Sequence, residues 1–181
     1  MLIRSALLLA AVWLTGCNDV LSTEPLVGKG DAVHDPALLG TWFDQENSVF
    51  TVTSRKPPEY DILYIETDKG ERNWIKGRLM QMGELRVLDV TDDRPGLFTL
   101  PVHAWLSVEK KGTGWEIRFL DSEWFQNRVR MSKLPYFTFE NSTVLTASTA
   151  RLQELVKQHG LGPEARSDAM LLAPFKKADE K

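Results

Sequence analysis

Between residues 40 and 120 the sequence carries seven short runs of β-forming residues, separated by short polar or glycine- and proline-containing connections. β-Branched and aromatic residues suit strands, and clusters of Gly, Pro, Asn and Asp mark turns. Connections this short join antiparallel neighbours, because a parallel crossover needs a dozen or more residues. The pattern predicts an antiparallel curled sheet or a small barrel. The predicted strands are Gly40–Asp44, Ser48–Arg55, Tyr60–Thr67, Arg72–Met80, Glu84–Thr91, Val102–Lys110 and Gly114–Leu120.

Some of these runs are apolar on both faces. Ile62 and Tyr64 on one side of a strand oppose Leu63 and Ile65 on the other. A strand with one face in water would alternate between apolar and polar residues. We therefore expect other elements to cover part of the outer face of the sheet.

The residues after position 120 supply that cover. A helix is predicted over Ser122–Lys133 with Asp121 as its N-cap, and a second helix begins at Ser148 and ends at Gly160. Tyr136–Leu145 and Met170–Phe175 are predicted strands. The fold class is therefore mainly β (α+β), with one or two helices packed near the C-terminal end of the chain.

The first residues have the pattern of a secretory signal peptide. Arg4 gives one positive charge, and Ser5–Leu14 carry no charge. Ten residues make a helix of about 15 Å, whereas a membrane-spanning helix needs about 20 residues. This segment is too short to be a permanent transmembrane anchor.

The tetrapeptide Leu14-Thr15-Gly16-Cys17 follows directly. It resembles the lipobox of bacterial lipoproteins, in which small residues precede an obligatory cysteine. The resemblance implies cleavage before Cys17, diacylglycerol on its sulfur and a fatty chain on its new amino group. Cys17 is the only cysteine, so lipidation explains a thiol that cannot form an internal disulfide. Asn18, where some inner-membrane lipoproteins have aspartate, favours the outer membrane.

The domain organisation follows from these features. Residues 17–35 contain Pro25, Gly28 and Gly30 with no sustained apolar period, which is typical of a flexible tether. Fully extended, this tether would span about 55–65 Å. The predicted parts are a signal peptide (1–16), the lipidated terminus and tether (17–35), a single β-rich domain (36–175) and a frayed C-terminus (176–181).

Composition and histidine positions exclude several functions. The formal net charge is −3 with interspersed charges, which gives no reason to expect a nucleic-acid partner. His34, His103 and His159 show no chelating spacing, so we expect no metal and no cofactor. His103, the only histidine in a predicted strand, has no accompanying nucleophile motif. We expect it to be an edge-facing or hydrogen-bonded strand residue and the protein not to be an enzyme.

Gly40-Thr41-Trp42 resembles the Gly-x-Trp motif that opens the first strand of lipocalins. The resemblance implies that Trp42 packs across the closed end of a barrel and that the glycine gives a neighbouring backbone room. The sequence departs from that family because it has no Thr-Asp-Tyr motif. Separately, residues 120–124 and 144–149 are similar to the tail of small bacterial lipoproteins of unknown function, which supports the helix caps.

Four tryptophans of the predicted sheet are candidates for a core or for a ligand site. These are Trp42, Trp74, Trp105 and Trp115, and the last three lie on strands that could share one face. One interpretation is core packing, since a small barrel needs large side chains to fill it. The other is an apolar cavity with an aromatic wall that binds a hydrophobic ligand.

The sequence thus predicts a cell-envelope lipoprotein held by lipid on Cys17, in the outer membrane and facing the periplasm. The favoured function is non-enzymatic: interaction with another envelope protein, or envelope maintenance. The alternative is a lipocalin-like carrier of a hydrophobic ligand.

Overall fold

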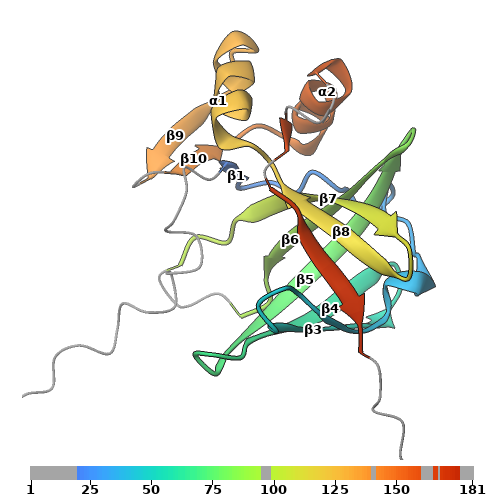
Figure 1. Cartoon of the computed structure of the whole chain (residues 1–181). Helices are drawn as coiled ribbons and strands as arrows, with labels where there is room; N and C mark the ends of the chain where they lie inside the picture. Colours follow the sequence, from blue (N-terminus) through green and yellow to red (C-terminus); the bar gives the residue numbers. More distant parts are fainter. Residues whose placement is uncertain (1–19, 95–98, 140–141, 160–164, 167, 176–181) are drawn as a thin grey trace, which may run out of the picture.

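The computed structural model describes residues 20–94, 99–139, 142–159, 165–166 and 168–175. Eight strands form a closed antiparallel barrel, a small lipocalin-like barrel as predicted (Figure 1). Seven of them follow one another as a meander, and the β6–β7 pairing helps to close the ring. The barrel strands are β2 (Gly40–Phe43), β3 (Val49–Lys56), β4 (Glu59–Glu66), β5 (Glu71–Met82), β6 (Leu85–Asp92), β7 (His103–Lys111), β8 (Gly114–Phe119) and β11 (Met170–Pro174).

The last strand of the chain completes the barrel wall. β11 lies between β8 and β2, with Leu172 opposite Trp115 and Pro174 opposite Trp42. The backbone of β11 passes very close to Gly114, where a Cβ atom would lie 2.0 Å from the carbonyl oxygen of Leu172. Glycine is therefore required at this position for the two strands to approach each other.

Three further strands continue the sheet beyond β7. They are β1 (Val20–Ser22), β10 (Ser142–Leu145) and β9 (Tyr136–Phe139). β1 pairs with β7 where Ser22 faces His103, and β10 then runs parallel to β1 and antiparallel to β9. Figure 1 shows β9 at the outer edge of this extension.

The predicted single strand over 136–145 is wrong, because this segment folds back on itself as a hairpin. Phe139 pairs with Ser142, so only two residues connect the strands, and they lie outside the described residues. Connections of two residues are the commonest in hairpins, and asparagine favours them. Asn141 was the overlooked turn signal.

The predicted flexible tether is also wrong from Val20 onward. Leu26 and Val27 are fully buried, and the backbone amide of Val33 donates to the carbonyl of Leu79 on the barrel (2.8 Å). The apolar residues of this segment occur in isolated pairs, such as Leu26-Val27, and show no period. Leu26 and Val27 nevertheless belong to the core that packs against the barrel wall. The folded domain therefore begins at Val20 rather than at residue 36, and residues 17–19 lie outside the described residues.

Two helices cover one side of the barrel, as the apolar outer faces predicted. The helices are α1 (Ser122–Met131) and α2 (Thr149–His159). Asp121 is the N-cap of α1, and its Oδ1 accepts from the amide of Trp124 (2.8 Å). The predicted end of the second helix at Gly160 lies outside the described residues. A first core lies between helices, N-terminal segment and barrel wall, and includes Leu26, Val87, Trp105, Phe125, Val129, Leu152 and Val156.

A second core fills the inside of the barrel. Inward-facing residues of all eight strands contribute to it, because side chains alternate between the two faces of a strand. Its members include Trp42, Tyr60, Ile62, Leu79, Leu88, Leu106, Val108, Trp115, Ile117 and Leu172.

Candidate functional site

The barrel interior holds two of the four candidate tryptophans. Trp42 and Trp115 are buried and meet edge to face, with 6.4 Å between ring centroids. The indole Nε1 of Trp42 donates to the carbonyl of Leu38 (3.0 Å). Tyr60, fully buried, lies in the same core. Side chains therefore occupy the space that an aromatic-walled cavity would need.

The glycine before Trp42 has a different role from the one that the lipocalin resemblance implies. A Cβ atom at Gly40 would meet nothing closer than 3.8 Å, so no neighbouring backbone needs the room. Its φ angle of +138° is the reason for glycine, since residues with a Cβ rarely adopt this conformation.

The expectation that Trp74, Trp105 and Trp115 share a face is wrong. Trp105 points outward from β7 and packs edge to face on Phe125 of α1 (5.5 Å between centroids). Trp74 is 36% exposed and stacks under the guanidinium of Arg94 (4.9 Å). Trp115 alone of the three faces inward. Strand pairing does not fix which face a residue occupies unless the register is known, because a shift by one residue reverses every side chain.

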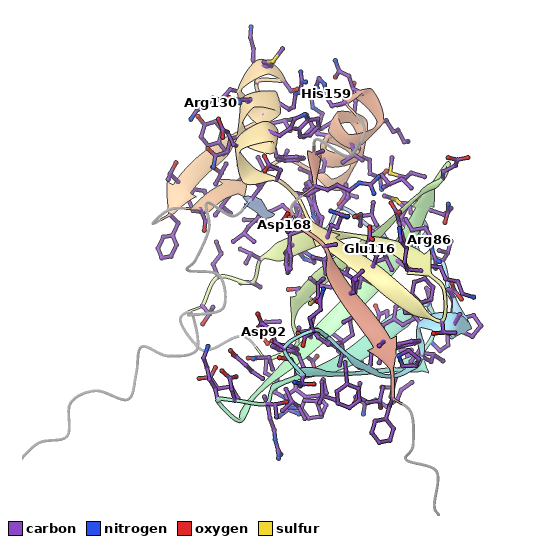
Figure 2. All side chains as sticks on the ribbon, in the orientation of Figure 1. Arg86, Asp92, Glu116, Arg130, His159 and Asp168 are labelled. Atoms are coloured by element: carbon purple, nitrogen blue, oxygen red, sulfur yellow. The ribbon has the colours of Figure 1, made fainter. Side chains whose placement is uncertain are left out.

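Arg86 closes one mouth of the barrel. Its guanidinium lies over the Trp115 ring (5.2 Å) and pairs with Oδ2 of Asp35 at 2.5 Å (Figure 2). Partial burial raises the pKa of Asp35. The hydrogen bond from the amide of Ala37 and the hydrogen bond and charge of Arg86 together lower it by more, so the pKa of Asp35 lies below its usual value. The pair attaches the N-terminal segment to β6 at the barrel mouth.

Next to this mouth is a groove of about 990 Å³. The β6–β7 ladder ends where Val87 faces Ser107, although β6 begins at Leu85 and β7 continues to Lys111. The two strands therefore separate here and leave backbone groups without a partner strand. Residues of the two separating strands, of the end of β5 and of α2 line the groove, among them Met82, Leu85, Val108, Lys110, Val156 and Lys157.

The groove lining mixes apolar and charged side chains. Arg166 pairs with Glu109 across it. Lys110 and Lys157 form no ion pair within the described part of the chain. A surface with apolar contacts, cations and exposed strand edges suits an extended polypeptide better than a small apolar molecule.

A smaller hollow of about 210 Å³ lies between the outer barrel wall and Pro25. Most of its lining residues are charged or polar, and Glu59, Lys76 and Arg78 among them form ion pairs. The guanidinium of Arg78 binds Oε1 of Glu59 at 2.6 Å, and Lys76 pairs with Asp61. The Arg78 hydrogen bond lowers the pKa of Glu59 despite the opposing effect of burial.

His103 lies in the same hollow as the hydrogen-bonded strand residue that the sequence predicted. Its Nδ1 is 2.7 Å from Oδ1 of Asp89, whose Oδ2 accepts from the amide of Val27 at 2.9 Å. The hydroxyl of Ser22, next to His103 in the sheet, donates to the carbonyl of Glu24 (2.6 Å). The hydroxyl of Ser22, the strand neighbour of His103, thus bonds to Glu24. The His103–Asp89 pair links β6, β7 and the N-terminal segment.

The remaining two histidines and the turn residue Asp92 have local roles. His34 stacks on Tyr60 (5.5 Å), and Nε2 of His159 is 3.1 Å from the hydroxyl of Ser132, which links the ends of α2 and α1 (Figure 2). Asp92 accepts from the amide of Arg94 (2.8 Å) as a turn residue. Within the described ranges, no three His, Cys, Asp or Glu side chains are placed to hold a metal ion.

One surface was not predicted from the sequence. Every residue of β9 is exposed, although the strand reads Tyr-Phe-Thr-Phe. Phe139 is 63% exposed, Tyr136 45% and Phe137 39%, and Met131 at the end of α1 is 68% exposed. Large contiguous apolar patches mark interaction sites or membrane contacts. The lack of polar alternation in β9 was the available signal.

Leu14, Thr15, Gly16 and Cys17, which resemble a lipobox, lie outside the described residues. In the part of the chain that is described, no helix has the length and apolar character needed to cross a membrane. Comparisons with protein families, with curated proteins and with solved structures find no match for this chain. Likeness to lipocalins is therefore one of architecture.

Proposed function

We propose that this protein is a bacterial cell-envelope lipoprotein whose barrel domain is held at a membrane surface by lipid on Cys17. The observation that carries the proposal is the distance in sequence between anchor and fold. Leu14-Thr15-Gly16-Cys17 has lipobox character, and the first strand begins at Val20, only three residues later. Three residues span at most about 11 Å. A lipid on Cys17 would therefore keep the domain against the bilayer rather than clear of it.

The domain acts there without catalysis, as a binding module for another envelope protein. The packed interior supports this role over that of a carrier, because side chains such as Trp42, Leu79 and Trp115 occupy it. The groove beside β6, β7 and α2 is the surface for the partner, and Lys110 and Lys157 would contact acidic side chains of an extended segment. Asn18 favours the outer membrane, and the proposed domain faces the periplasm.

Intact mass spectrometry of the full-length protein expressed in a bacterial host tests the anchor. We expect removal of residues 1–16 and a mass increase from acyl chains on Cys17. Cys17→Ser should abolish both processing and lipid mass, whereas Asn18→Asp should leave both intact and move the protein toward the inner membrane. Unchanged processing of Cys17→Ser would contradict the proposal.

Site-specific photocrosslinking in cells tests the groove. A photoreactive amino acid replaces Lys157 in one variant, and Lys69 in the exposed β4–β5 turn in the control. We expect one reproducible protein adduct at position 157 that is absent at position 69 and is weakened by Lys110→Glu. Equal adducts at both positions would show that the groove has no partner.

The lipocalin-like carrier remains the alternative, favoured by the closed eight-stranded architecture. A carrier would need the aromatic core around Trp42 and Trp115 to open. Native mass spectrometry of lipidated protein released from host membranes distinguishes the two functions. A stoichiometric non-covalent ligand would support the carrier, and a ligand-free mass would support the binding module.

A further inference from the structure

We propose that β9 and the end of α1 form a second membrane contact, which lays the domain on the bilayer beside its lipid anchor. This inference rests on the proposed lipidation of Cys17. Its occupant is the headgroup and upper acyl region of a phospholipid bilayer. The contact surface is the exposed edge strand β9, in which Phe137 and Phe139 share one face and Tyr136 lies on the other, together with Met131 and the basic residues Arg130 and Lys133 that precede it.

The sheet brings this surface next to the anchored end of the chain. Val20 pairs with Thr143, and Thr143 pairs with Thr138 of β9. With strands about 4.8 Å apart, Val20 and Thr138 are about 10 Å from each other. Figure 1 shows β1, β10 and β9 side by side in this order.

The direction of the strands adds to this proximity. β1 and β10 are parallel, so moving from Val20 toward the N-terminus corresponds to moving from Thr143 toward Ser142. Ser142 is the partner of Phe139, the most exposed aromatic residue of the hairpin. Cys17 can lie no more than about 11 Å from Val20. Val20, the first described residue after the proposed lipid attachment point, and Phe139 therefore lie at the same end of this small sheet.

One of the exposed aromatic residues, Phe137, continues an apolar row that is buried farther in. Phe137 lies opposite Val144, which is 2% exposed, and Val144 lies opposite Leu21, which is 6% exposed. The row thus runs from buried β1 across β10 to an exposed edge. Phenylalanine and tyrosine at such an edge suit the membrane interface, where aromatic rings occupy the level of the headgroups.

Basic residues border the aromatic strand. Arg130 and Lys133 are exposed, and neither forms an ion pair within the described residues. Bacterial membranes contain anionic phospholipids, and cations near an anionic bilayer surface are attracted to it electrostatically. Figure 2 labels Arg130 on α1, the helix that leads through Lys133 into β9.

The edge position of β9 limits how deep this contact can be. In the described residues β9 pairs only with β10, so the backbone groups along its outer edge have no strand partner. Such groups are costly in the hydrocarbon core, where no water is available. The strand therefore lies at headgroup level, where its backbone remains hydrated while the rings of Phe137 and Phe139 reach the acyl boundary.

Photolabelling by lipid tests the contact. The lipidated mature protein is reconstituted in vesicles of phosphatidylethanolamine and phosphatidylglycerol that contain a phospholipid with a photoreactive acyl chain. We expect labels on residues 134–139 well above those on Phe119, which is 48% exposed on β8. The double variant Phe137→Ser/Phe139→Ser should reduce labelling of this segment by on the order of tenfold. Phe119→Ser is the matched control and should leave it unchanged.

Each outcome separates this contact from the anchor. A protein with acyl chains on Cys17 but equal labelling at β9 and Phe119 would overturn the contact and leave the lipid anchor standing. Crosslinks between two copies through β9, in place of lipid labels, would also overturn it. A chain without acyl mass would overturn the anchor first. Phe137 is 39% and Phe139 63% exposed. An unchanged urea unfolding midpoint shows that the double variant is folded.

Discussion

Nδ1 of His103 lies 2.7 Å from Oδ1 of Asp89, and Oδ2 of the same carboxylate accepts from the amide of Val27 at 2.9 Å. Asp89 is 4% exposed, so its oxygens find their hydrogen-bond partners within the protein. One carboxylate thereby links β6, β7 and the N-terminal segment. A buried acid that carries this linkage is a structural requirement of the fold.

Asp89→Ala should destabilise the domain by about 3 kcal/mol. The variant removes the acceptor of the Val27 amide and leaves both that amide and the His103 ring without their partner. Asp89→Asn, which keeps one acceptor oxygen, should cost less. Urea unfolding measures both, and Asp68→Ala in the exposed β4–β5 turn is the control. A loss for Asp89→Ala no greater than for Asp68→Ala would contradict the proposed linkage.

Leu26→Ala tests whether the N-terminal segment belongs to the folded domain. Leu26 is fully buried in the core beneath the helices, and truncation of such a leucine costs about 2–5 kcal/mol. Val33→Ala, in the same segment but 39% exposed, should cost well under half as much. A flexible tether would show no loss of unfolding free energy in either variant, which would contradict this structure.

The architecture was predictable because its signals are local. Short turns between β-forming runs require antiparallel neighbours, and Asp121 marks the start of α1 whatever lies around it. The N-terminal segment gave no such signal. Leu26 and Val27 are an isolated apolar pair among glycines, prolines and charges, and only contacts distant in sequence, such as Val27 to Asp89, show that they are buried.

The placement of the tryptophans could not be derived for a related reason. Whether Trp74 or Trp115 faces inward depends on the register around a closed ring, and register is a property of all the strands together. Trp42 was the exception, because the resemblance of Gly40-Thr41-Trp42 to the lipocalin motif implied that this side chain packs in a barrel, and it lies in the interior core. The exposure of β9 depends on its being an edge strand, which follows only from the order β1, β10, β9.

Gly114→Ala should open the barrel seam between β8 and β11. The added Cβ would lie 2.0 Å from the Leu172 carbonyl oxygen, so the backbone of β11 must move. Overpacking of this kind costs about 1–3 kcal/mol, and more where backbone cannot yield. Hydrogen exchange of the β11 amides should accelerate in the variant. Gly30→Ala, where a Cβ would have no neighbour within 4 Å, should leave exchange in β11 unchanged.

The ion pairs on the outer wall should make stability depend on pH at the acid end. Hydrogen bonds from Arg55, and then from Lys76, lower the pKa of Asp61 from 3.8 to about 2. A pKa lowered by folding contributes stability above the unfolded value of 3.8, and this contribution is lost as the pH falls from there toward 2. Arg55 is 77% exposed, so solvent screens the interaction.

Asp61→Asn should therefore lower the unfolding free energy by about 1 kcal/mol near neutral pH. The difference between variant and wild type should shrink as the pH falls from about 4 toward 2, because the wild-type carboxylate is then protonated and no longer pairs with Arg55 or Lys76. Urea unfolding over this pH range measures it, with Asp68→Asn as the exposed control. A difference that stays constant down to pH 2 would mean that the Asn side chain, rather than the lost charge, causes the destabilisation.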